Sequence, residues 1–127
     1  MTYADAIRRA ADFHNVMAII YPKLPTLEKY GMDEGDYRMY YEAQDGVCAV
    51  CEKPPKEGKT LNVDHEHVKG WKKMPPEKRK KFVRGLLCFY CNRFYLSKAM
   101  TIPKAEKIKK YLEAYNVRQG KVIQGAR

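Results

Sequence analysis

The heptapeptide LNVDHEH, residues 61–67, joins a short apolar run typical of a β-strand to four consecutive ionisable side chains. Four such groups in a row would be costly to bury without a purpose. A Cys-x-x-Cys pair lies at some distance on each side, Cys48/Cys51 before the segment and Cys88/Cys91 after it. We interpret residues 61–67 as an active-site segment held in place by a metal-bound cysteine knot.

Length and composition predict one small domain, because 127 residues with 45% hydrophobic content suit a single modest core. No apolar run approaches the roughly 20 residues that span a bilayer. The N-terminal sequence MTYADAIRRA lacks the apolar middle region of a signal peptide. We therefore expect a soluble cytoplasmic protein with no membrane partner, in which cysteines stay reduced.

The net charge of +10 is unevenly distributed along the chain. Residues 1–47 carry five basic and eight acidic side chains, a balance of −3, whereas residues 48–127 carry 20 basic and seven acidic, a balance of +13. A positive field on the part that holds the cysteines and the 61–67 segment favours a polyanion such as DNA. The alternative is a lysine-rich surface that is simply well solvated.

Apolar spacing and turn residues predict the order of elements. We expect a helix over residues 3–19, a short turn over 26–31, a helix from Glu34 to about Gln44 capped by Asp33, strands at Thr60–Asp64 and Phe82–Leu87, a helix over about 92–99, and a last helix opened by Pro103. The two strands would form a long-looped antiparallel hairpin. Tyr37, Tyr40 and Tyr41 would form the buried face of the second helix, and Pro75-Pro76 would start a helical turn in the loop.

Two Cys-x-x-Cys pairs with no cysteine left over suit a tetrahedral Cys₄ zinc site at Cys48, Cys51, Cys88 and Cys91. Two disulfides or a redox motif are the alternatives, although a thioredoxin-like motif needs a βαβ context that this sequence lacks. A closed zinc site of this kind would be structural, stabilising a chain with a small core.

The 61–67 segment also contains groups suited to phosphodiester hydrolysis. Asp64 offers a carboxylate and Asn92 an amide oxygen for a catalytic Mg²⁺ or Mn²⁺, and His65 is the candidate general base, with His67 assisting. A regular strand would send Asp64 and His65 to opposite faces, so we predict that the strand ends or bulges there. The alternatives are histidines on a solvated loop or additional zinc ligands.

The motifs DGVCAVC, VDHEH and VRGLLCFYCN, between Asp45 and Asn92, resemble the recombination endonuclease VII family of phage enzymes, within the HNH or ββα-metal nucleases. The resemblance implies an α+β fold with a small zinc-stapled ββα-metal (HNH/His-Me finger) core and flanking N- and C-terminal helices. It implies structural zinc at the four cysteines, Mg²⁺ at Asp64 and Asn92, and His65 as base. It also implies DNA as substrate, in the type member a branched Holliday junction cut by a homodimer, in the bacterial host cell of a phage or prophage.

On this basis we expect three segments in one compact domain: a helical lead-in at 1–46, the nuclease core at 47–101, and a C-terminal helix and basic tail at 102–127. The sequence departs from the family pattern in two places. The loop from Lys69 to Arg84 is longer and more basic, and Tyr95 replaces an expected acidic residue, for which Glu66 could compensate. Candidate DNA contacts are Lys69, Lys72, Lys73, Lys78, Arg79, Lys80, Lys81, Arg84 and Arg93.

The predicted function is a metal-dependent DNA endonuclease with a one-metal HNH mechanism. Branched DNA and duplex DNA, the latter nicked or cut in restriction or packaging, stay open as substrates. A non-catalytic zinc module that only binds nucleic acid is the alternative from another class. Simple binding needs Lys and Arg but no base, so the histidines favour the enzyme.

Overall fold

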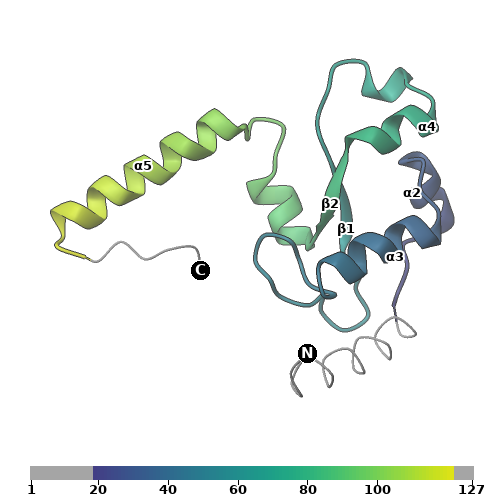
Figure 1. Cartoon of the computed structure of the whole chain (residues 1–127), viewed down its shortest axis with the longest axis horizontal. Coiled ribbons are helices and arrows are strands. Elements are labelled where there is room, and N and C mark those ends of the chain that lie inside the picture. The colour runs from purple at the N-terminus through teal and green to yellow at the C-terminus, as the bar shows by residue number, and fades with distance from the viewer. Residues whose placement is uncertain (1–18, 122–127) are drawn as a thin grey trace. The chain divides into compact units, whose positions relative to one another are not determined.

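A computed structural model describes residues 19–121, and the helix expected over 3–19 lies almost wholly outside them. The elements form a mixed arrangement of helices around a small two-stranded sheet (Figure 1). In chain order they are α2 (Leu24–Lys29), α3 (Glu34–Ala43), β1 (Asn62–His65), η1 (Trp71–Lys73), α4 (Pro76–Arg79), η2 (Lys80–Phe82), β2 (Val83–Leu87), η3 (Cys91–Tyr95) and α5 (Ile102–Arg118). The chain divides into two compact units, the first ending at Phe94 and the second beginning at Tyr95.

The predicted antiparallel hairpin is confirmed. Asn62 pairs with Leu87, Val63 with Leu86 and Asp64 with Gly85, after which the register shifts so that His65 pairs with Val83. The first strand begins later than expected, at Asn62, which pairs with Leu87, the last residue of β2. The long connection between the strands contains η1, α4 and η2, and Pro76 lies in the first turn of α4 as predicted.

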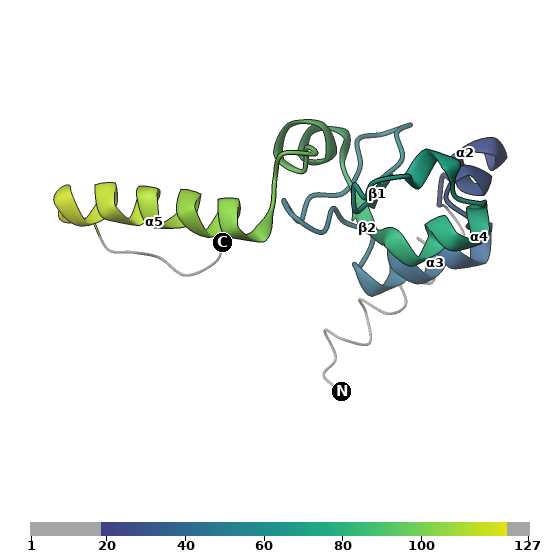
Figure 2. The ribbon, with the colours of Figure 1, turned by 90° about the horizontal axis from the view of Figure 1, so that it is seen from above.

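The two helices before the sheet begin at residues suited to helix starts. Pro25 lies in the first turn of α2, where its missing N–H costs nothing. Asp33 caps α3 as predicted, and its side chain and that of Asp36 form a reciprocal capping box. Figures 1 and 2 show α2, α3 and α4 on one side of the hairpin and η3 on the other.

The core is small and is built where α2, α3 and the hairpin meet. Its buried apolar side chains among the described residues are Leu27, Met32, Tyr37, Cys48, Leu61, Val63, Trp71, Leu86, Leu87 and Cys91. Of the three tyrosines expected to be buried, Tyr37 is fully so and Tyr40 and Tyr41 are half-buried. Tyr37 donates its hydroxyl hydrogen to the Leu61 carbonyl at 2.7 Å, which fixes α3 to the residue before β1.

Gln44 supplies the hydrogen bonds that a third strand would give to β2. Its Nε2 donates to the Leu86 carbonyl at 2.8 Å and to the Val47 carbonyl at 2.9 Å, and its Oε1 accepts from the Leu86 N–H at 2.9 Å. The outer edge of β2 is therefore satisfied at Leu86 by a side chain from the end of α3.

The helix expected over about 92–99 is shorter and starts earlier. The chain turns after β2 into η3, a π-helical segment, and a turn closed by the Met100 N–H and the Ser97 carbonyl follows.

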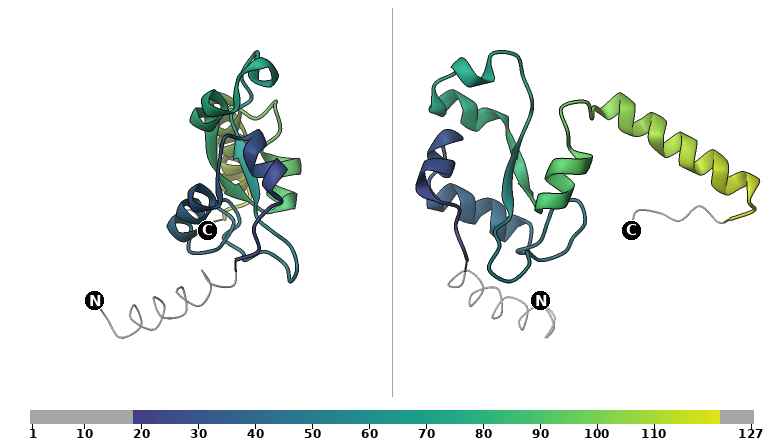
Figure 3. Two further views of the ribbon diagram at one scale, coloured as in Figure 1. Left: turned by 90° about the vertical axis from the view of Figure 1, so that its right-hand side faces the viewer. Right: turned by 180° about the vertical axis from the view of Figure 1, so that it is seen from behind.

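α5 starts just before Pro103, with the Thr101 hydroxyl capping it through the Lys104 N–H. Ile108, Leu112 and Tyr115 lie on α5, but no side chain of this helix is buried. Figure 3 shows both units from two further directions. Among residues 19–121, no helix is long and apolar enough to cross a membrane.

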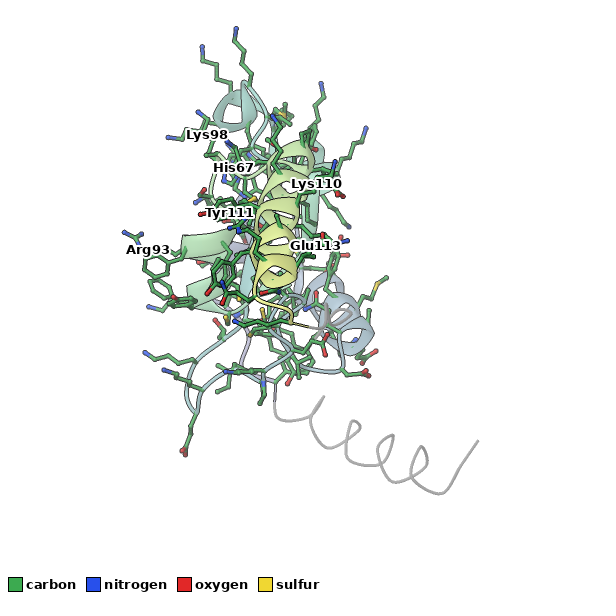
Figure 4. The ribbon with its side chains drawn as sticks, turned by 90° about the vertical axis from the view of Figure 1, so that its left-hand side faces the viewer. His67, Arg93, Lys98, Lys110, Tyr111 and Glu113 are labelled. Atoms are coloured by element: carbon green, nitrogen blue, oxygen red, sulfur yellow. The ribbon has the colours of Figure 1, made fainter. Side chains whose placement is uncertain are left out.

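Replacing Tyr37 with Phe should lower the free energy of unfolding by about 1–2 kcal/mol, because the buried Leu61 carbonyl loses its donor while the ring stays in place. Tyr111→Phe is the matched control, since Tyr111 is 76% exposed on α5 (Figure 4). Urea unfolding followed by circular dichroism measures both. Equal stability of the two variants would contradict a role for the Tyr37 hydroxyl in fixing α3.

Candidate functional site

Four cysteine sulfurs come together at the end of the hairpin. The Sγ atoms of Cys48, Cys51, Cys88 and Cys91 all lie within 4.8 Å of one another, and Cys48 and Cys91 are buried. The Cys51 and Cys88 sulfurs are 3.8 Å apart, far beyond the roughly 2.05 Å of a disulfide. Tetrahedral zinc with Zn–S bonds of about 2.3 Å separates its sulfurs by about 3.8 Å. The cluster could therefore hold a structural metal ion such as zinc.

Local backbone turns aim these sulfurs inward. The Val50 N–H points to Cys48 Sγ and the Cys91 N–H to Cys88 Sγ, each at 3.4 Å. Glu52, just after the first pair, has a left-handed φ of 60°, and its N–H donates to the Cys48 carbonyl. Burial raises the pKa of the Cys48 thiol, but backbone N–H hydrogen bonds outweigh it and bring that pKa to about 6. The same hydrogen bonds would stabilise a Cys48 thiolate, the form that binds a metal ion.

Asp64 and His65 lie where the hairpin pairing is irregular, as predicted from the sequence. Asp64 pairs with Gly85 and His65 with Val83, so Arg84 is an extra residue on β2 and forms a bulge. Its guanidinium makes two bonds to the Asp64 carboxylate, Nε to Oδ2 at 2.7 Å and Nη2 to Oδ1 at 3.0 Å. Among the described residues, Asp64 is the one buried charged side chain, at 5% exposure. The hydrogen bonds to Asp64 raise the pKa of Arg84.

The two histidines lie side by side, as an extended chain predicts for residues two apart. The ring centroids of His65 and His67 are 4.8 Å apart. Desolvation by burial, followed by the nearby His67, lowers the pKa of His65 below its ordinary value. A lowered pKa favours the neutral imidazole at neutral pH, which is the form that can accept a proton.

Sequence reasoning did not identify two aromatic neighbours of His65. The Trp71 ring stacks on the imidazole, with the ring centroids 4.2 Å apart and the planes inclined by 24°. The Tyr30 ring centroid lies 5.5 Å from that of the imidazole. Trp71 is the chain's single tryptophan and is 8% exposed, although the sequence around it is rich in lysine. A tryptophan is highly buried on average, and a single one in such a segment is a signal that could have located it.

Asn92 follows Cys91 directly, and its backbone N–H donates to the Cys88 carbonyl at 3.0 Å. It is half-buried at the start of η3. Within the described part of the chain, the structure gives no hydrogen bond between the Asn92 side chain and Asp64. The structure therefore brings His65 and His67 together, next to Asp64 in the chain, and ties the Asn92 backbone to Cys88 of the cysteine cluster.

The nine basic residues proposed as DNA contacts fall into two groups. Arg79, Lys80 and Arg84 have partners within the protein: Arg79 donates to three backbone carbonyls, Lys80 pairs with Asp36 at 3.0 Å, and Arg84 pairs with Asp64. The other six side chains are exposed. They are Lys69, Lys72, Lys73, Lys78, Lys81 and Arg93, of which Figure 4 shows Arg93 pointing outward from η3.

A two-stranded hairpin that carries an acid and two histidines thus leads into four cysteines that could hold a metal ion. The chain belongs to the recombination endonuclease VII family, whose model matches residues 24–114. It is similar to the Gene 59 proteins of Mycobacterium phages L5 and D29, each 37% identical over 70 residues. That match covers 55% of this chain and 36% of each relative, so the chain spans about a third of their length. No solved structure matches.

Replacing Cys48 or Cys88 with Ser should lower bound metal and thermal stability together, because the remaining three sulfurs no longer complete a tetrahedral site. Elemental analysis of purified protein measures zinc per chain, and calorimetry measures the melting temperature. Ser97→Ala, outside the cluster, is the control for effects of mutagenesis and purification on zinc content and melting temperature. A Cys48→Ser protein with one zinc per chain and the parental melting temperature would contradict the assignment.

Proposed function

We propose that this chain is a metal-dependent DNA endonuclease that hydrolyses phosphodiester bonds with an HNH, or ββα-metal, core. The observation that carries the proposal is the bulged hairpin that sets Asp64 beside His65 and leads directly into the four-cysteine cluster. The core would comprise β1, β2 and η3 within residues 47–101. Residues 1–46 would be a helical lead-in, and residues 102–127 a C-terminal helix and basic tail.

The donor set of the cysteine cluster fits zinc. Four sulfurs leave no open position for substrate, so this ion would be structural. It would fix the start of η3, and with it Asn92, relative to the end of β2.

Asp64 and Asn92 are the proposed ligands of a separate Mg²⁺ or Mn²⁺ ion, with oxygen donors as such ions prefer. The fit of Asp64 is supported by its buried carboxylate, which is already neutralised by a cation, the Arg84 guanidinium. When bound, the ion would offset charge on the phosphate and assist the departing 3′ oxygen. Arg84 would have to release at least one Asp64 oxygen, which would free its guanidinium for a phosphate.

His65 is the proposed general base. An unprotonated ring nitrogen of its imidazole would accept a proton from the attacking water, and the lowered pKa supports a neutral ring at neutral pH. His67, 4.8 Å away, would orient the water or the phosphate. Attack on phosphorus with loss of the 3′ oxygen leaves a 5′-phosphate and a 3′-hydroxyl.

Branched DNA is the proposed substrate, on the strength of family membership. Duplex DNA that is nicked, or cut in restriction or packaging, is the alternative within the enzyme class. The six exposed basic side chains would contact phosphates, which suits either DNA form because phosphate contacts carry no sequence information. A homodimer belongs to the branched-substrate proposal.

Cleavage of a labelled four-way junction and of a linear duplex of the same sequence, each with Mg²⁺ or Mn²⁺, tests the activity and ranks the substrates. Asp64→Ala and His65→Ala should each lower the cleavage rate at least 100-fold and leave DNA affinity within a few-fold. Glu57→Ala, in an exposed turn, is the control and should cleave at the parental rate. A zinc-loaded parent that binds DNA and cuts neither form would favour the non-catalytic module.

Arg84→Gln should destabilise the protein by about 1–3 kcal/mol, because the buried Asp64 carboxylate loses its charged partner. Added Mn²⁺ should then raise the melting temperature of the variant more than that of the parent, since the ion no longer competes with a guanidinium for Asp64. Arg93→Gln removes the same charge from an exposed position and serves as control. An identical response of all three proteins to Mn²⁺ would contradict an ion site at Asp64.

A further inference from the structure

The basic segment between the strands is folded, and we name residues 69–82 the basic arm. Gly70 opens it with a left-handed φ of 81°, and η1, α4 and η2 then follow with hardly a gap. The arm returns to the sheet at Val83, opposite His65. Its fold raises the question of what the arm holds in place, in addition to any charge it presents.

Arg79 stabilises the basic arm through hydrogen bonds to backbone carbonyls. Its Nε donates to the Trp71 carbonyl at 3.1 Å, its Nη1 to the Lys29 carbonyl at 3.0 Å and its Nη2 to the Lys72 carbonyl at 2.7 Å. Its guanidinium carbon also lies 4.5 Å from the centre of the Trp71 ring. A planar fork with several donors suits this task, and lysine could not reproduce it.

The arm is seated against the end of α2. Gly31 has a φ of +70°, and a Cβ at this position would clash with the Pro76 carbonyl oxygen in α4. The Arg79 bond to the Lys29 carbonyl crosses the same junction. Close backbone approach at Gly31 and the Arg79 bond therefore fix the position of the arm relative to α2.

The arm delivers one side chain to the candidate active site, that of Trp71. The indole stacks on the His65 imidazole with the ring centroids 4.2 Å apart. The Tyr30 ring, from the end of α2, adjoins both, with its centroid 5.5 Å from that of His65 and 5.7 Å from that of Trp71. The Trp71 Nε1 is buried with no hydrogen-bond acceptor among the described residues. An unsatisfied donor costs stability, so the ring's contribution here is its flat apolar face.

We propose that Trp71 is a positioning residue for His65, and that Arg79 and the basic arm keep Trp71 stacked on the imidazole. The inference deepens the proposed nuclease function and rests on it. Stacking on one face and Tyr30 on the flank restrict the orientation of the imidazole, which a general base needs in order to meet the attacking water. Arg79 is then a structural residue of the site and not one of the phosphate contacts.

Substitution of the neighbouring basic residues Arg79 and Lys78 should have different kinetic effects. Arg79→Gln should lower kcat about 10-fold or more with little change in KM, because the imidazole loses its fixed orientation. Lys78→Gln removes the same charge from an exposed position on the same short helix. If Lys78 contacts a phosphate, Lys78→Gln should instead raise KM and weaken the salt dependence of binding, with kcat unchanged.

Trp71 is tested with two variants of graded size. Trp71→Phe keeps an aromatic face and removes the unsatisfied Nε1–H, so it should retain most of the parental kcat and stability. Trp71→Leu removes the stack and should lower kcat at least 10-fold. Should Trp71→Leu fail to fold, Arg79→Gln still tests the claim because it leaves Trp71 in the chain.

Proton NMR of the His65 imidazole supplies a readout that does not depend on cleavage. The indole ring current should shift the His65 ring C–H resonances in the parent and in Lys78→Gln. That shift should shrink in Arg79→Gln and disappear in Trp71→Leu. Assignment uses His65→Ala, and zinc content checks that each variant is folded.

The outcomes distinguish the two levels of inference. A parent that cuts no DNA, with the ring-current pattern as expected, defeats the proposed function and leaves Trp71 and Arg79 as the residues that orient His65. Folded Trp71→Leu or Arg79→Gln proteins with parental kcat, or an unchanged His65 resonance in both, would overturn the positioning role. Equal effects of Arg79→Gln and Lys78→Gln on KM alone would overturn it as well, in favour of phosphate contact.

Discussion

The convergence of four cysteine sulfurs is the constraint on which the first unit of the chain depends. Cys48 and Cys91 are two of the ten buried apolar residues found among residues 19–121, so the cluster is also part of the core. Four thiol groups within 4.8 Å of one another become mutually repulsive as they ionise, unless a cation shares their charge. A metal ion bound at this point would therefore contribute to folding directly. It would fix the end of β2, the start of η3 and the turn at residues 48–52.

The geometry of the hairpin also shapes the candidate site at the His65 end of β1. The bulge at Arg84 changes the register between Asp64 and His65, so that the carboxylate is buried against a guanidinium while the imidazole meets Trp71 and His67. Two ionisable side chains that are adjacent in sequence thus have different environments, one in an ion pair with Arg84 and the other stacked on Trp71. Environments that separate neighbouring titratable groups in this way are common at catalytic sites.

Much of this arrangement follows from local sequence rules. The cysteine spacing, the Asp33 cap, the antiparallel strands and the bulge at Asp64 were all predictable, because each depends on residues close in the chain or on a side-chain period. The basic arm was not predictable in the same way. The Arg79 bond to Lys29 and the close approach of Gly31 to Pro76 join residues about 50 apart. The lysine-rich composition suggested either a DNA contact or a solvated charge run, whereas the structure shows a folded segment in which Trp71 is buried.

Two ions with different chemistry are central to this account, one held by sulfur and one exchangeable at Asp64. Anomalous diffraction from a crystal grown with Mn²⁺, recorded at the zinc and manganese edges, tests it most directly. The account predicts a zinc peak among the four cysteine sulfurs and a separate manganese peak at the Asp64 carboxylate, with Arg84 withdrawn from at least one oxygen. Manganese absent from Asp64 with the Arg84 pair intact, or a cysteine cluster without metal, would contradict it.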